Sequence, residues 1–440
     1  MTADAPVNLR IKPGGKLHGR IQTPGDKSVS HRALMLGAIA DGDTHITGFL
    51  QGEDTRATMS ALQAMGVIID QDEVDIVVHG VGLHGLTAPS TVIDLGNSGT
   101  STRLLAGLLA GQGFDSRIVG DPSLMKRPMR RIVEPLQLMN ADISCSVEGT
   151  LPLEIHGGRK LQGIDYKLPV ASAQLKSSLL LAGLYANGRT CVHEPAPTRD
   201  HTERLLQYFG GKIEEHNSTV CIYKSSGLKA QNISVPADIS SAAFFMIGAT
   251  IAGGSDIILE GVGINPTRSA VITILQQMGA NITLRNQQVI SGEPVADIRV
   301  KSGPLHAIDI PAEYVPGAID EFPAIMVAAA CARGTTRLQG AAELRVKESD
   351  RIRAITAGLR AIGITVVEHE DGMEVTGGNI RGGEVDSHTD HRIAMAFIMA
   401  GLVSEQPVVV QDCVNINTSF PGFVEQARSA GMDIMQVACK

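Results

Sequence analysis

The sequence predicts an α/β fold of two similar domains, each built from three copies of one helix–strand–helix–strands unit. Three observations lead to this prediction. The chain has 440 residues, more than a single hydrophobic core usually supports, so two domains are expected. Hydrophobic residues make up 43% of it and charged residues 19%, which is typical of a globular protein. One sequence pattern then recurs six times, with a period of roughly 70 residues.

The clearest mark of the repeat closes each unit. An amphipathic helix ends in Gly or Asn, and Ile or Val follows three residues later. Gly and Asn accept the left-handed conformation that a helix C-terminus requires. The six pairs are Gly66/Ile69, Asn140/Ile143, Gly210/Ile213, Gly279/Ile282, Gly363/Val366 and Gly431/Ile434.

Each unit begins with another helix, whose apolar residues recur at three- and four-residue spacing, as in Val29/Ala33/Leu36. A strand follows most of these first helices. The predicted strands are Thr44–Thr47, Thr190–His193, Asp256–Glu260, Thr335–Gln339 and Val408–Gln411.

Six units divide into two domains of three. A strand-like segment, Leu9–Ile21, precedes the first unit, and Pro236–Ala237 opens the fourth. We therefore expect one domain at about 24–236 and the other at 1–23 plus 237–440.

Charge and composition exclude several classes of function. The net charge is −8, which argues against a broad surface for nucleic acid or an anionic membrane. Aromatic residues make up only 3% and Trp is absent, so base-stacking surfaces are not expected. The apolar stretches Ala324–Ala332 and Ile393–Val403 fall short of the roughly 18 residues that cross a bilayer. The N-terminus has no export signal, so we expect a cytoplasmic protein.

The cysteines predict reduced thiols. They are scattered without CxxC pairs, a pattern that suits the cytosol better than a disulfide framework or a zinc site. The six are Cys145, Cys191, Cys221, Cys331, Cys413 and Cys439.

The first helix of each unit starts with small, hydroxyl or charged residues. Helix N-termini offer unpaired N–H groups and a partial positive charge, so six such ends aimed at a common cleft would attract anions. For any single one, an ordinary N-cap is the favoured alternative, but six in register favour ligand binding. The starts are Asp26-Lys27-Ser28, Asn97-Ser98-Gly99-Thr100, Ser172-Ala173-Gln174, Asp238-Ile239-Ser240, Asp320-Glu321 and Thr389-Asp390-His391-Arg392.

Basic residues beside these helix starts support an anion site, because Arg suits bidentate capture of phosphate or carboxylate and Lys supplies a compact charge. An alternative for Lys347–Arg351 is a solvated helix face in which Glu348 pairs with Arg351. His391, taken alone, would be a structural histidine. The basic residues are Lys27, Arg32, Arg127, Arg130, Arg199, Lys347, Arg351 and Arg392.

Six long motifs, in order along nearly the whole chain, resemble those of the 3-phosphoshikimate 1-carboxyvinyltransferase family of enolpyruvyl transferases. The motifs are PGDKSVSHRAL (24–34), LGNSGTSTRLL (95–105), GDPSLMKRPM (120–129), SAQLKSSLLLAGL (172–184), RVKESDRI (345–352) and DHRIAMAF (390–397). The resemblance implies an inside-out α/β fold. Its two domains close on substrate, and each holds three βαβαββ units with pseudo-threefold symmetry.

The resemblance also implies the reaction. Phosphoenolpyruvate and shikimate 3-phosphate give the enolpyruvyl ether and phosphate, a step of the shikimate pathway to aromatic amino acids, without metal or organic cofactor. We expect a monomer that acts on small molecules.

Site residues follow from the resemblance and from the helix starts. The implied reaction needs a carboxylate base and a second proton carrier, so Asp320 is the candidate base for the 5-hydroxyl, with Glu348 and Lys27 as candidates for proton exchange at C3 and the leaving phosphate. The resemblance assigns the binding of shikimate 3-phosphate to Lys27, Ser28, Arg32, Ser172, Gln174, Asp320 and Lys347. It assigns the binding of phosphoenolpyruvate to Lys27, Gly99, Arg127, Gln174, Arg351 and Arg392. Further substrate-binding candidates are Asn97, Ala173, Arg199 and His391.

Several positions differ from the better-known branch of the family and resemble its second class. Ala173 stands where Ser is frequent, Glu343 where Asn is common, and Leu104 where Pro follows the Arg. The run 417–421 lacks a Lys that contacts phosphoenolpyruvate in that branch. Glyphosate, which mimics phosphoenolpyruvate in this family, is an expected inhibitor because Gly99 has no side chain to crowd the pocket.

Two alternatives stay open at this point. UDP-N-acetylglucosamine 1-carboxyvinyltransferases share the fold, but they commonly carry a reactive Cys that the run 120–125 lacks. A non-catalytic repeat protein that binds phosphorylated metabolites would keep the repeat. It would not need Lys27, Asp320 and Glu348 together.

Overall fold

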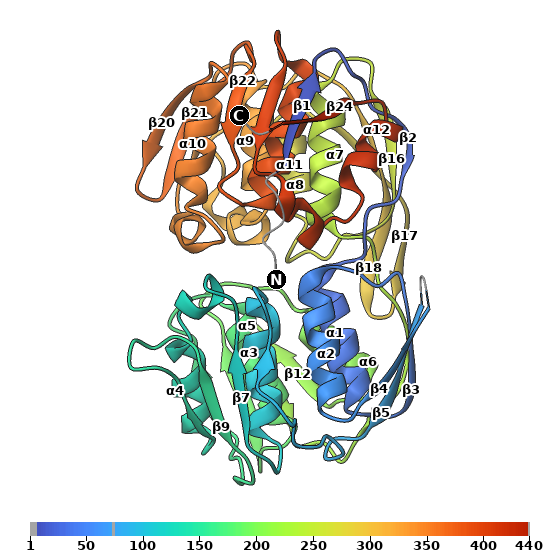
Figure 1. Cartoon of the computed structure of the whole chain (residues 1–440), viewed down its shortest axis with the longest axis vertical. Helices are drawn as coiled ribbons and strands as arrows, with labels where there is room; N and C mark the ends of the chain where they lie inside the picture. The colour runs from blue at the N-terminus through green and yellow to red at the C-terminus, as the bar shows by residue number, and fades with distance from the viewer. Residues whose placement is uncertain (1–6, 73–74, 439–440) are drawn as a thin grey trace. The chain divides into compact units, whose positions relative to one another are not determined.

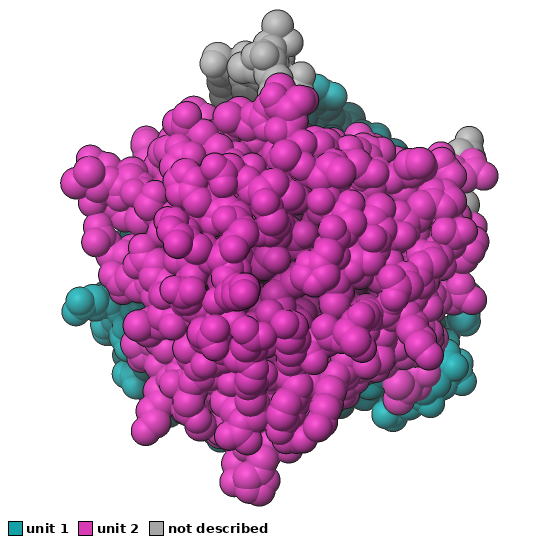
Figure 2. Space-filling model, turned by 90° about the horizontal axis from the view of Figure 1, so that it is seen from below, with its two compact units in different colours: residues 1–24, 237–288, 294–440 teal, residues 25–236, 289–293 magenta. Residues whose placement is uncertain are grey.

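The computed structural model describes residues 7–72 and 75–438, drawn in Figure 1. The chain divides into two compact units, coloured separately in Figure 2. Buried apolar side chains form two separate clusters, one in each unit. Unit 1 comprises Met1–Pro24, Ala237–Gln288 and Pro294–Lys440, and unit 2 comprises Gly25–Pro236 and Val289–Glu293. The sequence did not predict that Val289–Glu293 belongs to unit 2.

Unit 2 contains three copies of one βαβαββ motif. In each copy the first strand pairs in parallel with the second, and the fourth lies antiparallel between the second and third. The first copy comprises β14 (Leu228–Lys229), β15 (Asn232–Ser234), α1 (Lys27–Ala38), β3 (Ala40–Thr47), α2 (Glu53–Ala64), β4 (Ile68–Gln71) and β5 (Asp75–Val81). The second comprises β6 (Ile93–Asp94), α3 (Gly99–Ala110), β7 (Ser116–Val119), α4 (Arg130–Leu138), β8 (Asp142–Ser144) and β9 (Leu153–His156). The third comprises β10 (Asp165–Lys167), α5 (Ala173–Gly183), β11 (Arg189–His193), α6 (His201–Tyr208), β12 (Ile213–His216) and β13 (Thr219–Tyr223).

Unit 1 repeats the motif, with the N-terminal strands completing it. The first copy comprises β2 (His18–Ile21), α7 (Ile239–Ile251), β16 (Asp256–Gly263), α8 (Ala270–Gln277), β17 (Asn281–Ile290) and β18 (Glu293–Lys301). The second comprises α9 (Phe322–Ala330), β19 (Thr335–Leu338), α10 (Arg351–Ala361), β20 (Thr365–His369) and β21 (Gly372–Thr376), with isolated parallel bridges at His306 and Asp309 in place of a first strand. The third comprises β22 (Gly383–Asp386), α11 (His391–Ala400), β23 (Val408–Gln411), α12 (Phe423–Ser429), β24 (Asp433–Val437) and β1 (Asn8–Lys12). The predicted α/β class with repeated units is therefore confirmed.

The first helix of every copy is an interior helix. α3 is buried at every residue except Thr100, and α9 is buried along its whole length. A helix that is apolar all round has to be surrounded by protein. In unit 2, α3 packs against α5, and in unit 1, α7, α9 and α11 contact one another. Each sheet therefore covers interior helices, as the inside-out description implies.

The six predicted helix ends have the left-handed backbone that the repeat requires. The φ angle is 69° at Asn140 and 118° at Gly431. It is also positive at the other four helix ends, Gly66, Gly210, Gly279 and Gly363. The Ile or Val three residues later lies in β4, β8, β12, β17, β20 or β24. This part of the sequence prediction is confirmed.

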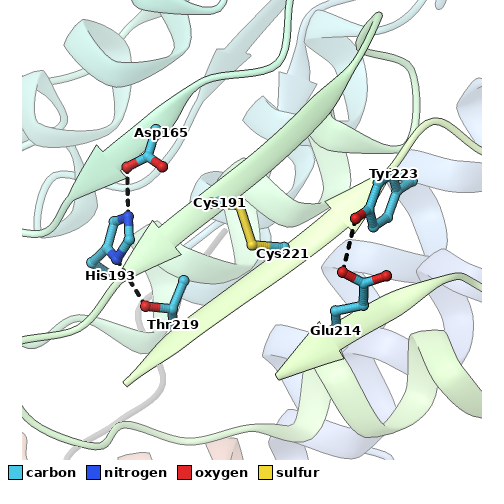
Figure 3. Close-up of a disulfide and its surroundings, with 7 residues drawn as sticks. All are labelled: Asp165, Cys191, His193, Glu214, Thr219, Cys221 and Tyr223. Carbon is cyan, nitrogen blue, oxygen red and sulfur yellow. Dashed lines mark hydrogen bonds and ion pairs between the residues drawn. A yellow bond between two sulfur atoms is a disulfide. The ribbon is translucent and has the colours of Figure 1, made fainter. Parts of the chain in front are cut away.

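One cysteine pair corrects the expectation of reduced thiols. Cys191 on β11 and Cys221 on β13 form a disulfide, with their Cα atoms 4.1 Å apart (Figure 3). The two residues are directly opposite in an antiparallel pair. The N–H of Cys191 donates not to Cys221 but to the carbonyl oxygen of Ile164, the residue before β10, at 2.7 Å. Residues in such a non-hydrogen-bonded pair have closer Cα atoms. Strand register, which the spacing of cysteines did not reveal, therefore brings the two sulfurs together.

Reducing this disulfide is expected to lower the free energy of unfolding without disrupting the sheet. The bond spans a sequence separation of 30, for which chain-entropy arguments give about 3 to 4 kcal/mol. The β11–β13 ladder is expected to stay hydrogen-bonded without it, because the two strands pair over five residues each. Urea unfolding of the oxidised protein and of a Cys191→Ser/Cys221→Ser variant measures the difference, with Cys145→Ser as the control. Thiol titration in denaturant should gain two groups on reduction, and an unchanged count would refute the bond.

Among residues 7–72 and 75–438, none of the helices has the length and apolar character needed to cross a membrane.

Candidate active site

The starts of the three interior helices of unit 2 are tied together by polar side chains. The Nδ1 atom of His31 lies 2.8 Å from Thr58 Oγ1 and 3.4 Å from Ser101 Oγ, which joins α1, α2 and α3. Burial lowers the pKa of His31 to about 3, so its ring is neutral at neutral pH. Gln174 Nε2 donates to Thr100 Oγ1 at 3.1 Å, which joins α5 to α3. The three copies thus present their helix N-termini at one place in unit 2.

N-capping accounts for some of the residues at these starts. Asp26 accepts a hydrogen bond from Val29 N at 2.8 Å, and Ser98 and Ser172 cap α3 and α5 in the same way. The alternative interpretation of the helix starts, an ordinary N-cap, is thus correct for these three side chains. Ser172 was also a predicted substrate ligand, and its hydroxyl caps α5 at the long distance of 3.4 Å.

Lys27 and Arg32 both project from α1, but their surroundings differ. Lys27 Nζ lies 2.8 Å from Asp54 Oδ2, and both side chains are partly exposed. Arg32 is buried and donates to Thr202 Oγ1 at 2.6 Å, to Ser177 Oγ at 2.9 Å and to Ser28 O at 2.9 Å. Burial lowers the pKa of Arg32 to about 10, which leaves it charged at neutral pH. Arg32 is thus a fixed positive charge held by hydroxyl groups.

Two further arginine side chains, those of Arg103 and Arg127, surround the start of α3. Arg127 donates to Asn97 Oδ1 at 2.6 Å, and Arg103 donates to Gln174 Oε1 at 2.6 Å. A Cβ atom on Gly99 would lie 3.0 Å from an Arg103 nitrogen and 3.2 Å from an Arg127 nitrogen. The absence of a side chain at Gly99 therefore lets two guanidinium groups approach the helix N-terminus, an arrangement suited to an anion. Arg103 was missing from the predicted site, although it lies within the LGNSGTSTRLL motif.

The predicted residues of unit 1 form a cluster of mixed charge around Arg351. The Arg351 side chain is only 1% exposed and lies 2.8 Å from Asp390, 2.6 Å from Glu348 and 3.4 Å from Asp320. Burial alone would lower the pKa of Arg351, but Asp390, Glu348 and Asp320 raise it above its ordinary value. The Glu348–Arg351 pair of the alternative interpretation does form. It is not part of a solvated face, since Arg351 is buried.

Two further cations flank Asp320. Lys347 Nζ lies 3.7 Å from Asp320 Oδ1, and Arg392 donates to the backbone carbonyl of Asp320 at 3.1 Å. Arg392 also lies 3.8 Å from Glu321, a buried carboxyl whose pKa is raised by burial. Asp390 caps α11 through Arg392 N, and although burial opposes its charge, Arg351 keeps the pKa of Asp390 below its ordinary value. Asp390 and Glu321 were missing from the predicted site because they were taken only as helix starts.

Three other predicted residues lie at the edges of these groups. Ala173 is the first residue of α5, His391 is buried at the start of α11, and Arg199 lies in the loop between β11 and α6. Within the residues that the structure describes, no group of three or more His, Cys, Asp or Glu is arranged to hold a metal ion.

Comparison with known proteins decides the family. Residues 11–427 match the model of EPSP synthase (3-phosphoshikimate 1-carboxyvinyltransferase). The chain belongs to the EPSP synthase family. It is 58% identical to the 3-phosphoshikimate 1-carboxyvinyltransferase of Nitrosococcus oceani over 425 residues, 96% of each chain. It is 57% identical to that of Methylococcus capsulatus, over 98% of this chain and 99% of the relative. The predicted family is confirmed.

Solved structures agree with this family. An EPSP synthase from Acinetobacter baumannii is 52% identical to the chain and superposes with a TM-score of 0.91, covering 98% of this chain and 100% of that one. The enolpyruvyl transferase NikO from Streptomyces tendae, only 16% identical, shares the fold with a TM-score of 0.80. This member of the EPSP synthase family thus has the two-domain α/β fold of its relatives. The UDP-N-acetylglucosamine alternative loses its support.

Proposed function

We propose that this protein transfers the 1-carboxyvinyl group of phosphoenolpyruvate to the 5-hydroxyl of shikimate 3-phosphate and releases phosphate, by addition and elimination through a tetrahedral intermediate. The observation that carries the proposal is the clustering at the interior helix starts. Unit 2 collects Lys27, Arg32, Arg103 and Arg127 there, and unit 1 surrounds Arg351 with carboxylates. Together with family membership, these clusters supply anion binding and proton transfer.

The unit 2 cluster is suited to hold charged groups of the substrates. Gly99 and the guanidinium groups of Arg103 and Arg127 form a cradle in which N–H donors and positive charge face one position. We assign this cradle to phosphoenolpyruvate. Arg32 and the first turn of α5 bind shikimate 3-phosphate in this assignment.

The unit 1 cluster is suited to proton transfer. The 5-hydroxyl loses a proton as its oxygen attacks C2 of the enol, and C3 gains one. The intermediate then loses a proton from C3 and expels phosphate. Asp320, flanked by Lys347 and Arg351, is the proposed base for the hydroxyl. Glu348, whose side chain is about one third exposed, is the proposed proton carrier at C3, with Lys27 acting on the leaving phosphate.

Family, composition and fold suggest the wider setting. We propose that the two compact units are the two domains, that the protein acts as a cytoplasmic monomer, and that the reaction needs groups of both units and no cofactor. If a reducing cytoplasm opens the Cys191–Cys221 disulfide, the two thiols stay adjacent, because the strand ladder holds their backbones.

A phosphate-release assay tests the proposed function. Phosphoenolpyruvate, shikimate 3-phosphate and UDP-N-acetylglucosamine are supplied singly and in pairs to the purified protein. Release that requires phosphoenolpyruvate and shikimate 3-phosphate together is expected. Release with UDP-N-acetylglucosamine in place of shikimate 3-phosphate would overturn the assignment. The absence of phosphate release with every pair of substrates would overturn it too.

Replacing Gly99 by Ala is expected to weaken inhibition by glyphosate by about tenfold, equivalent to about 1.4 kcal/mol. The new methyl group would press on Arg103 and Arg127, which have to move apart. Inhibition constants against phosphoenolpyruvate measure the effect. Gly113→Ala is the matched control, since a Cβ there meets nothing within 4 Å. Equal constants in wild type and Gly99→Ala would remove the steric argument.

A further inference from the structure

A buried lysine that the proposed reaction does not use lies two residues beyond the proposed substrate contacts of α5. The Lys176 side chain is 1% exposed, and its Nζ lies 2.6 Å from Glu203 and 2.8 Å from Glu194. Both glutamates are almost fully buried. Burial alone would lower the pKa of Lys176, but Glu203 and Glu194 raise it, so the ammonium group stays charged.

The two glutamates stand on either side of one loop. Glu194 directly follows β11, the strand that carries Cys191 and His193 in Figure 3, and Glu203 lies in the first turn of α6. Residues 195–200 connect them and include Arg199. A single ammonium group thus binds both sides of this loop.

The connection continues to Arg199 itself. Lys176 binds Oε2 of Glu194, and the other oxygen of Glu194 accepts a hydrogen bond from the Thr198 hydroxyl. Thr198 directly precedes Arg199. The backbone that carries Arg199 is therefore fixed through one carboxylate to α5.

The next residue of α5 makes the parallel connection to α1. Ser177 accepts hydrogen bonds from Arg32 at 2.9 Å and from Thr202 at 2.6 Å, and Thr202 also accepts from Arg32 at 2.6 Å. Two consecutive residues of α5, Lys176 and Ser177, thus contact two consecutive residues of α6. Arg32 and Arg199 are both held by this buried polar layer.

A buried ammonium with two carboxylates is a costly way to join helices, because apolar side chains of similar volume would be as stable or more so. Such groups are best explained when they fix one geometry rather than add stability. Resting on the proposed function, we propose that Lys176 is a positioning residue: its ammonium group fixes the 194–200 loop so that Arg199 and Arg32 are preorganised to bind shikimate 3-phosphate.

Calorimetric binding of shikimate 3-phosphate to the full chain tests this role without turnover. Lys176→Met should raise the dissociation constant by about tenfold or more, since small misplacements of positioning groups have large effects. Lys176→Arg, which keeps the charge, should recover much of the loss. In turnover, KM for shikimate 3-phosphate should rise while KM for phosphoenolpyruvate changes less than twofold.

Matched variants separate positioning from stability. Leu180→Ala leaves a cavity on the same helix and should lower the melting temperature while binding shikimate 3-phosphate within twofold of wild type. Lys224→Met repeats the substitution at an exposed site. If Lys176→Met fails to fold, Thr198→Val breaks only the link from Glu194 to the loop, whereas Glu194→Gln also removes one of the two carboxylates of Lys176; each should weaken binding at least threefold.

The outcomes distinguish the two proposals. Wild-type protein that neither binds nor turns over shikimate 3-phosphate contradicts the proposed function itself. If the wild type is active, dissociation constants within twofold of wild type for the folded variants, Thr198→Val included, refute the positioning role. Equal weakening by Leu180→Ala would refute it too, because the effect would then follow stability.

Discussion

Replacing Asp320 by Ala is expected to lower kcat by about 10² or more, the usual scale for a lost general base. Its carboxylate lies beside Lys347 at 3.7 Å and Arg351 at 3.4 Å. The substitution therefore removes the proposed base and leaves two cations facing each other. KM values for both substrates should also rise, but the test is the kcat of the variant divided by the kcat of the wild type. Steady-state phosphate release measures it.

Asp309→Ala is the control for this experiment. Asp309 pairs with Arg337 at 3.1 Å in the same unit, but its side chain is 74% exposed, so little change in stability or rate is expected. Near-normal kcat in Asp320→Ala would remove Asp320 from its role. Glu348→Gln should likewise lower kcat by about 10², because it keeps the shape of the side chain and removes the proton carrier.

Local backbone requirements made the repeat predictable. A helix end at Gly66 or Asn140 needs a left-handed φ, and only a few residue types provide it. The requirement is local, so the six positions could be recognised from spacing alone. The family resemblance depended on motifs of the same kind, in which consecutive residues carry the signal.

Contacts between distant segments could not be predicted in this way. Arg351 meets Asp320 and Asp390 across 31 and 39 residues. Cys191 meets Cys221 only because β11 and β13 pair in that register. Glu293 pairs with His201 at 2.7 Å across 92 residues, in a buried contact within unit 2. Each contact depends on how sheets and helices pack, which composition and periodicity do not specify.

The same distinction explains what the predicted site left out. The sequence identified Arg351 and Glu348 because they share a motif, yet it assigned Arg351 directly to phosphoenolpyruvate. In the structure Arg351 is almost fully enclosed by carboxylates. Beside its proposed contact with substrate, Arg351 thus holds Asp320, Glu348 and Asp390 together, and of these three contacts the sequence indicated only the pair with Glu348.

Replacing Arg351 by Met is expected to lower the free energy of unfolding by about 3 to 5 kcal/mol, because removing one partner of a buried ion pair leaves uncompensated charge. Three carboxylates would then share the cluster without the guanidinium that lies 2.8 Å from Asp390 and 2.6 Å from Glu348. Urea unfolding followed by circular dichroism measures the loss. Arg337→Met, at an exposed pair with Asp309, should leave the free energy of unfolding nearly unchanged.

The pH dependence of this loss tests its electrostatic origin. In the wild type the pKa of Asp390 is lowered despite burial, chiefly by Arg351, so its contribution is present above the ordinary carboxyl value and is lost as pH falls through the lowered value. Without Arg351, burial dominates and raises the pKa of Asp390. Folding of the variant then takes up a proton at this carboxyl, so the stability of the variant increases as pH falls. The destabilisation should therefore be largest near pH 8 and smaller near pH 5, and adding Asp390→Asn should relieve part of it at pH 8. A loss that is constant across this range would mean that Arg351 stabilises unit 1 through packing, and the carboxylate cluster would then need another explanation for its charge.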